Sequence, residues 1–315
     1  MAAAMLSGLT TTASADALLG PFFDTRSGSL TLPTVVTKGF AAPVNTVFTT
    51  DWLWFFKSSL TELDEECQFT SGPGSQKAND MTTWNAASGA AIFDPSTSEG
   101  MMQQLPNQVG MFMVGNGMTG DEHAMAGETI FLSLTSSGFF FTSYRMINDP
   151  NETTTANFDD VAYGAFGSQV TVAPLLMWQP GSLFLTNWIV SVVDADMENT
   201  NLWVEVQVAT PIQGSNGAGN NYTLGRFYDR DGVQRTTSVR VTVRCIGALT
   251  VQDLLGAGGI SIAPNGGWAH LGIRDLDVDT VALEVPGALD RGILVGKIEN
   301  LGDFSLYTSQ NRTDF

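Results

Sequence analysis

The sequence predicts an all-β protein, an antiparallel sandwich of short strands with long loops and only short accessory helices. Two observations lead to this prediction, and the first is composition. Only 15% of the 315 residues are charged, against about 25% in an average globular domain, while Gly, Thr, Ser, Phe and Trp are prominent. Apolar residues make up 43% of the chain, enough to bury one large core or two modest ones.

The second observation is a series of eight strand-like runs, separated by loops rich in Gly, Asn, Asp, Pro and Ser. They cover residues 45–56, 108–114, 128–134, 138–147, 168–176, 182–193, 201–210 and 236–246. In the last run, Val239, Val241 and Val243 alternate with Arg240 and Arg244. Alternation with a period of two predicts a strand with one buried face and one polar face.

Eight strands with long loops must protect the edges of their sheets from other chains. A double-sheet jelly roll, another sandwich or a closed barrel would each do so. Among these we expect an eight-stranded antiparallel jelly roll.

The two ends of the chain differ from this middle part. Residues 1–46 are rich in Ala, Thr, Ser, Gly and Pro and carry only Arg26 and Lys38 as basic groups. We expect an N-terminal extended arm over residues 1–46, a jelly-roll shell domain over 47–249, and C-terminal strands or a small module over 250–315. The additional strands expected in the last part cover residues 278–285, 292–298 and 304–308.

Two short helices are expected beside the strands. Residues 58–66 place Leu60 and Leu63 at a spacing that would turn both inward. Residues 249–256 form the second helix, with Gly256 just beyond its last turn.

Cysteine and charge content limit the remaining possibilities. Cys67 and Cys245 allow at most one internal disulfide, and two buried thiols are favoured because long-range bridges are rare in chains with a sufficient core. No apolar run approaches the roughly 20 residues that span a bilayer. The net charge of −18 argues against a nucleic acid or an anionic membrane engaged over the whole surface.

Three stretches carry a resemblance to a known class of protein: TTDWLWFFKSS (49–59), SLFLTNWIVSVVDADMENTNLWVEVQVATP (182–211) and RTTSVRVTVRCIG (235–247). With the eight strands and the arm of small residues, residues 46–248 resemble the jelly-roll coat protein of a small non-enveloped icosahedral virus, most like those of plus-strand RNA viruses. The resemblance implies a structural capsid subunit of the virion, many copies of which assemble into a shell around a viral genome. It implies no enzymatic activity.

Composition also favours assembly. The chain has twelve Met, nineteen Phe and seven Trp with only four Lys, and interfaces between proteins are depleted in charge and enriched in aromatic residues and Met. We therefore expect a homo-oligomer of many copies.

Positive charge is concentrated in one stretch of this acidic chain. Five of the fourteen basic residues lie within nineteen positions: Arg226, Arg230, Arg235, Arg240 and Arg244. Many coat proteins of the class carry a basic N-terminal arm, which this chain lacks, so phosphates of the genome, expected to be RNA, would be bound by these arginines without sequence specificity. The alternative is that they pair with nearby carboxylates.

Two acidic clusters are candidates for Ca²⁺ at subunit interfaces. Their carboxylates alternate along the chain, at Asp194, Asp196 and Glu198 and again at Asp275, Asp277 and Asp279. Ca²⁺ accepts six to eight oxygen ligands in a flexible geometry, which such sets can supply. A solvated acidic turn is the alternative reading of each cluster.

Enzyme motifs are absent from the sequence. Only His123 and His270 are present, without H-E-x-x-H, C-x-x-C or G-x-S-x-G. Gly115, Gly117 and Gly120 match G-x-G-x-x-G, but no long helix follows them, so a turn is expected rather than a nucleotide site. The alternative function is a β-sandwich binding module, such as a lectin-like domain or a phage fibre or decoration protein, which recognises carbohydrate or a cell surface through exposed Trp and Tyr.

Overall fold

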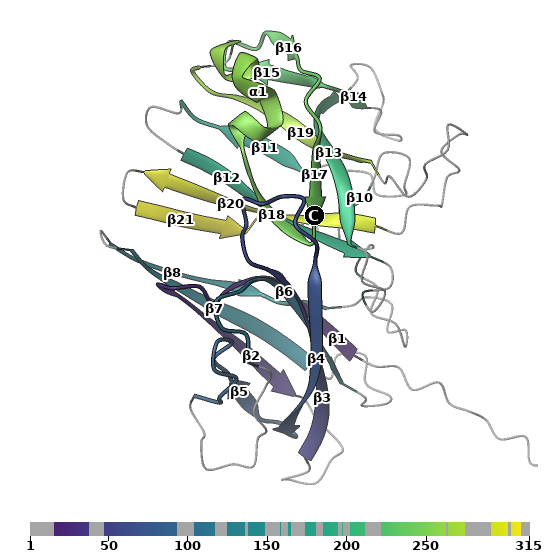
Figure 1. Cartoon of the computed structure of the whole chain (residues 1–315), viewed down its shortest axis with the longest axis vertical. Helices are drawn as coiled ribbons and strands as arrows, with labels where there is room; N and C mark the ends of the chain where they lie inside the picture. The colour runs from purple at the N-terminus through teal and green to yellow at the C-terminus, as the bar shows by residue number, and fades with distance from the viewer. Residues whose placement is uncertain are drawn as a thin grey trace, which may run out of the picture.

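The computed structural model describes most of the chain and confirms an all-β protein. Its described residues are 16–37, 47–92, 104–116, 125–135, 138–148, 158, 163–164, 174–180, 185–194, 197, 202–211, 222–262, 264–274, 291–301 and 304–309. Twenty-one strands and one helix are assigned in this part of the chain, and every strand pair is antiparallel. The strands form four sheets (Figure 1).

Sheets 1 and 2 are built from the first half of the chain. Sheet 1 has the order β4 (Gln68–Lys77), β3 (Val47–Lys57), β6 (Val109–Asn116), β1 (Asp16–Asp24) and β9 (Ile147–Asn148). Sheet 2 has the order β5 (Met81–Thr83), β2 (Ser29–Thr37), β7 (Met125–Thr135) and β8 (Gly138–Arg145).

Sheets 3 and 4 are built from the second half. Sheet 3 has the order β10 (Tyr163–Gly164), β20 (Arg291–Leu301), β12 (Leu185–Asp194) and β18 (Ile246–Thr250), with β21 (Phe304–Ser309) beside β20. Sheet 4 has the order β14 (Tyr222–Leu224), β13 (Trp203–Pro211), β19 (Gly267–Arg274), β15 (Arg226–Asp229) and β16 (Gln234–Thr236). In the same sheet, β11 (Leu175–Trp178) pairs with β19 and β17 (Val241–Arg244) pairs with β13.

The single eight-stranded jelly roll is not confirmed, because four sheets share the strands. Most of the expected runs form strands where the structure describes them: 45–56 is β3, 108–114 is β6, 128–134 is β7, 138–147 contains β8, and 182–193 and 201–210 are β12 and β13. The run 236–246 is instead divided among β16, β17 and β18, and residues 168–173 of the run 168–176 lie outside the described residues. What the pattern did not show is how these strands are distributed among sheets.

Part of the expected N-terminal arm is core instead. Residues 16–24 and 29–37 are β1 and β2, each paired with a long strand, β6 and β7 respectively. Leu18, Leu19 and Phe23 of β1 are buried. Small and polar residues around these strands concealed their apolar faces when the segment was judged by its composition. Residues 1–15 and 38–46 of the expected arm lie outside the described part of the chain.

The expected C-terminal module is likewise interleaved with the preceding strands. β19 pairs with β13 in sheet 4, and β20 pairs with β12 along ten residues in sheet 3. Helix α1 (Val251–Ile262) starts where a helix was expected, and Gly256 interrupts it with a φ of 70°. The expected helix over 249–256 thus ends at Gly256, whose positive φ a glycine adopts readily, although helical turns resume afterwards.

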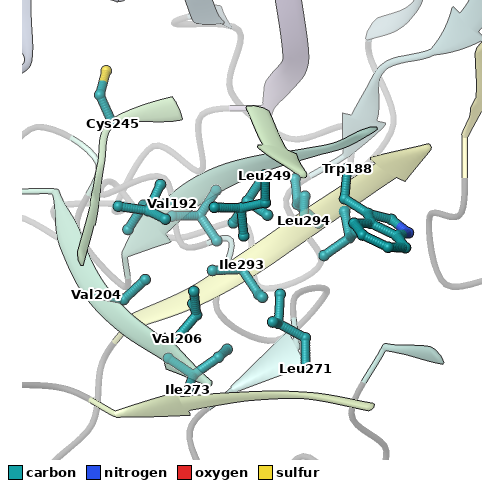
Figure 2. Close-up of a cluster of buried hydrophobic side chains, with 14 of the residues drawn as sticks. Trp188, Val192, Val204, Val206, Cys245, Leu249, Leu271, Ile273, Ile293 and Leu294 are labelled. Carbon is teal, nitrogen blue, oxygen red and sulfur yellow. The ribbon is translucent and has the colours of Figure 1, made fainter. Parts of the chain in front are cut away.

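Sheets 3 and 4 enclose an aliphatic core (Figure 2). Trp188 and Val192 of β12 and Ile293 of β20 face Val206 of β13 and Leu271 of β19. Strand β12 is buried on both faces, because its residues 188–193 are all inaccessible. Its second face meets the first half of the chain, and the Ser191 hydroxyl donates to the carbonyl of Pro21 at 2.5 Å.

Sheets 1 and 2 enclose a different core, made of large aromatic rings. Trp52 lies 5.1 Å from Trp84, and Trp54 lies 5.0 Å from Phe23, both in edge-to-face contact between ring centroids. Phe112 of β6 stacks against the same group, in the space left by Gly20 of β1.

The connection between β3 and β4 joins the two halves through backbone hydrogen bonds and a disulfide. The connection between β3 and β4, residues 58–67, is a series of turns and not the expected helix, although Leu60 is buried. The N–H groups of Arg244 and Ala248 donate to carbonyls of this connection, those of Leu63 and Leu60, each at 2.8 Å.

Cys67 and Cys245 form a disulfide at the end of this connection, so the expectation of two free thiols is wrong. Their Cα atoms are 5.1 Å apart, although 178 positions separate them in sequence. The connection and the turn between β17 and β18 bring the two residues together, a proximity that depends on how the halves pack.

Candidate functional site on the outer face of sheet 4

Sheet 4 has one face in the core and one face toward solvent. Along β19, Ala269, Leu271 and Ile273 are buried between the sheets, whereas Trp268 and His270 alternate with them and are only half-buried. The outer face is therefore where this sheet presents its aromatic and basic side chains.

Four aromatic rings from distant segments meet on this face, and we call them the aromatic patch: Tyr222, Tyr228, Trp268 and His270. Tyr228 stacks on Trp268, with ring centroids 4.6 Å apart and planes 18° from parallel. His270 lies edge-on to Trp268 at 6.2 Å and to Tyr222 at 5.2 Å. Cross-strand pairing explains the arrangement, because Tyr228 and Trp268 are directly opposite in β15 and β19.

Exposed aliphatic side chains border the aromatic patch. Strand β11 pairs Leu175 with His270 and Met177 with Trp268. Leu175 is 40% exposed and Met177 is 46% exposed. The patch is thus an accessible apolar surface and not an outlying part of the core.

An ordered set of polar side chains lies at the other border. The amide nitrogen of Gln234 donates to the Tyr228 hydroxyl at 3.3 Å and to Thr210 Oγ1 at 3.2 Å. Arg226 Nη1 donates to the amide oxygen of Gln234 at 2.8 Å. Gln234 therefore holds Arg226 and Tyr228 in a fixed relation.

Asp229 and Arg235 form the best-made ion pair on this sheet. Nε and Nη2 of Arg235 each lie 3.0 Å from Oδ2 of Asp229, and the N–H groups of Asp231 and Val233 donate to Oδ1. Desolvation raises the pKa of Asp229, but the hydrogen bond from Val233 and the guanidinium of Arg235 outweigh it, so the pKa is lowered. A lowered carboxyl pKa adds stability at neutral pH, and this is lost as pH falls through the folded-state value.

Two further arginines of the predicted basic strip also face carboxylates. Arg240 lies 3.5 Å from Glu205, and Arg244 lies 4.0 Å from Glu66. The Arg244 guanidinium is 5.8 Å from the ring centroid of Trp203, at cation–π distance.

The five predicted nucleic-acid-binding arginines therefore divide into two groups. Arg235, Arg240 and Arg244 meet carboxylates, as the alternative reading expected, while Arg226 and Arg230 are exposed. Nucleic-acid binding by the five stays a prediction.

The strand that suggested the basic strip is shorter than expected. Strand β17 begins only at Val241, so Val239 and Arg240 precede it. Val243 is buried as expected, and Val241 is half-buried.

Of the predicted calcium ligands, only Asp194 lies among the described residues. Its Oδ2 accepts from Nε of Arg291 at 3.1 Å. Asp196, Glu198, Asp275, Asp277 and Asp279 lie outside them. Within the described ranges, no three His, Cys, Asp or Glu side chains are grouped as a metal site requires, and calcium stays a prediction.

The aromatic patch was not found from the sequence. Its residues come from three strands and are up to 48 positions apart, from Tyr222 to His270, so no local motif connects them. The run GWAHLGIR does alternate, and this signal could have placed Trp268 and His270 on one face.

Comparisons with known proteins identify no relative. No protein-family model, curated protein or solved structure matches the chain. The part of the chain that the structure describes contains no helix with the length and apolarity needed to cross a membrane.

Proposed function

We propose that the chain is a structural subunit that assembles with copies of itself into a closed icosahedral shell around a viral genome. The sequence resemblance to jelly-roll coat proteins first suggested this function. Neither catalysis nor a resident cofactor is part of the proposal.

One structural observation supports it: most of the large apolar side chains that are exposed in the described part of the chain lie on edge strands of the sheets. Phe69 lies on β4, at the edge of sheet 1, and is 56% exposed; Met81 lies on β5, at the edge of sheet 2, and is 64% exposed. Phe141 on β8, Leu175 and Met177 on β11 and Leu224 on β14 repeat the pattern at other edges.

Edge strands with apolar side chains bind other chains unless something covers them. Among the described residues, no further strand pairs with the outer side of β4, β8, β11 or β14. Neighbouring copies around a shell would cover all of them at once, and this is the property that the proposed function requires.

The proposal includes a jelly-roll winding for sheets 3 and 4, which the second half of the chain forms. Strand β12 of sheet 3 pairs with β18 and β20, while its successor β13 in sheet 4 pairs with β17 and β19. Successive strands thus cross between the two sheets around a shared core, as in Greek-key sandwiches.

Sedimentation velocity and negative-stain electron microscopy of the purified chain test the function. We expect particles far larger than the 33.6 kDa subunit. A monodisperse monomer at micromolar concentration and moderate salt would overturn the proposal.

Variants test the observation that supports it. Phe69→Lys and Met81→Lys should each reduce assembly, because each places a charge on an open sheet edge. Leu185→Lys is the matched control, since Leu185 is 64% exposed but lies on β12, which has a strand on each side in sheet 3. Equal assembly of all three variants would show that the sheet edges are not contacts.

A further inference from the structure

We infer that the outer face of sheet 4 is a contact surface for a second copy of this chain, and that it receives the acidic β3–β4 connection of that copy. The inference rests on the proposed function and names one of its contacts. We call the first surface the basic-aromatic surface, formed by Met177, Arg226, Tyr228, Arg230 and Trp268. The second is the acidic connection, residues 58–67, with the exposed carboxylates of Glu62, Asp64 and Glu66.

Charge distribution is the first argument. Residues 222–250 contain five arginines and two aspartates, whereas the other residues carry nine basic and thirty acidic side chains. A second copy is therefore repelled from most of this molecule and attracted to one region. Complementary charge of this kind orients two proteins as they meet.

Composition of the basic-aromatic surface is the second argument. Trp, Tyr and Arg supply most of the binding free energy at protein interfaces, and Met is enriched there. Arg226 and Tyr228 are already held by Gln234, at 2.8 Å and 3.3 Å. Side chains that are ordered before binding lose less conformational entropy when the partner arrives.

The acidic connection is also ordered before a partner binds. The disulfide at Cys67 and the backbone bonds to Leu60 and Leu63 fix its path. The Glu65 carboxylate folds back onto the Ser58 hydroxyl at 2.9 Å. The carboxylates of Glu62 and Asp64 are thereby presented from a fixed segment, beside that of Glu66, which lies 4.0 Å from Arg244 of the same copy.

The two surfaces lie apart on one molecule, so they join different copies. In Figure 1, β15 and β16 are at one end of the long axis, whereas β4, which follows the acidic connection, begins near the middle of that axis and runs toward the other end. A contact between different surfaces of identical chains is heterologous, and it forms a ring when its rotation closes. Rings of this kind are what a shell needs around its symmetry axes.

Two complementary variants test the inference. Arg226→Glu with Arg230→Glu reverses the charge of the basic-aromatic surface. Glu62→Gln with Asp64→Asn and Glu66→Gln removes the charge of these three carboxylates from the acidic connection. We expect each variant to need a concentration about tenfold higher, or more, for assembly. Arg240→Glu is the matched control, because Arg240 is exposed but precedes β17 and belongs neither to the basic-aromatic surface nor to an edge strand; it should assemble as the unaltered chain does.

Mixing the two variants in equal amounts is the decisive step. Each variant retains the surface that the other has lost, so one intact contact can form per pair. At a concentration at which neither variant assembles alone, sedimentation velocity should then show a complex that contains both variants. A mixture that stays monomeric would overturn the pairing of these two surfaces.

Two other results would also overturn the inference while leaving the proposed function intact. One is normal assembly of both variants. The other is normal assembly of the arginine variant together with loss of binding to a 20-nucleotide oligo-uridine, which would assign Arg226 and Arg230 to nucleic acid. A monomeric unaltered chain, in contrast, would refute the proposed function itself.

Discussion

The two halves of the molecule fill their cores with different kinds of side chain. Between sheets 1 and 2, buried rings of Trp52, Trp54 and Trp84 meet edge-to-face or stacked. Between sheets 3 and 4, β-branched residues such as Val204 and Val206 fill the core from adjacent strands.

The difference shows that aromatic content does not by itself indicate an interface. The stretch TTDWLWFFKSS contributed to the resemblance to coat proteins, yet Trp52, Trp54 and Phe55 are wholly buried. The aromatic residues available to a partner are fewer and lie elsewhere, on the edge strands β4 and β8 and on the outer face of sheet 4. An aromatic core depends on a few large contacts, and an aliphatic core on many small ones.

Removing one ring should have the largest effect. Trp52→Ala leaves a cavity among Trp54, Trp84 and Phe112, and we expect it to lower the free energy of unfolding by about 3–5 kcal/mol. Urea unfolding followed by circular dichroism measures this. Phe69→Ala, on an exposed ring, should change the value by less than about 0.5 kcal/mol; a similar loss from both variants would contradict the role assigned to the aromatic core.

Removing the disulfide between the halves should have the second-largest effect on stability. Cys67→Ser frees a closed loop of 178 positions, and we expect a loss of about 2–4 kcal/mol. Reductant should lower the melting temperature of the unaltered chain but not that of Cys67→Ser. Equal sensitivity of the two proteins would show that the disulfide is not what reduction affects.

Truncation in the aliphatic core should cost less than truncation in the aromatic core. Val206→Ala removes two methyl groups from a fully buried side chain, which corresponds to roughly 2 kcal/mol. The same urea unfolding experiment applies. A loss as large as that of Trp52→Ala would remove the contrast between the cores.

We expect the smallest effect on stability from a buried lysine beside the β3–β4 connection. Lys57, at the end of β3, is fully buried, and its Nζ donates to the Glu62 carbonyl at 2.5 Å. Burial lowers the pKa of Lys57 to about 8, although the charges of Glu65, Asp64 and Glu62 oppose this shift. The pKa of an unfolded lysine is about 10.4.

Between these two pKa values the unfolded chain binds more protons than the folded chain, so Lys57 makes stability rise with pH in that window. Lys57→Met should remove this part of the rise. Unfolding free energies at about pH 7.5 and about pH 9.5 measure it, since only the unaltered chain should gain from the change. Identical pH dependence in both proteins would show that Lys57 does not titrate in this range.

Local pattern determined much of the secondary structure. Alternation marked β12 and β13, apolar runs marked β3, β6 and β7, and Gly256 marked the interruption of α1. Each of these depends on side chains within a few positions of one another, which a sequence displays directly. The low content of charged residues likewise indicated a chain with much surface to bury.

Tertiary structure alone decided which strands share a sheet and which faces remain open. Period-two alternation says that a face is buried but not against what, so β1 and β2 could not be recognised as the partners of β6 and β7. The Cys67–Cys245 disulfide and the meeting of Tyr228 with Trp268 have the same origin. In a β protein these neighbours are brought together by long-range pairing, and the free energy that selects the pairing belongs to the packed sheets and not to any short segment of the chain.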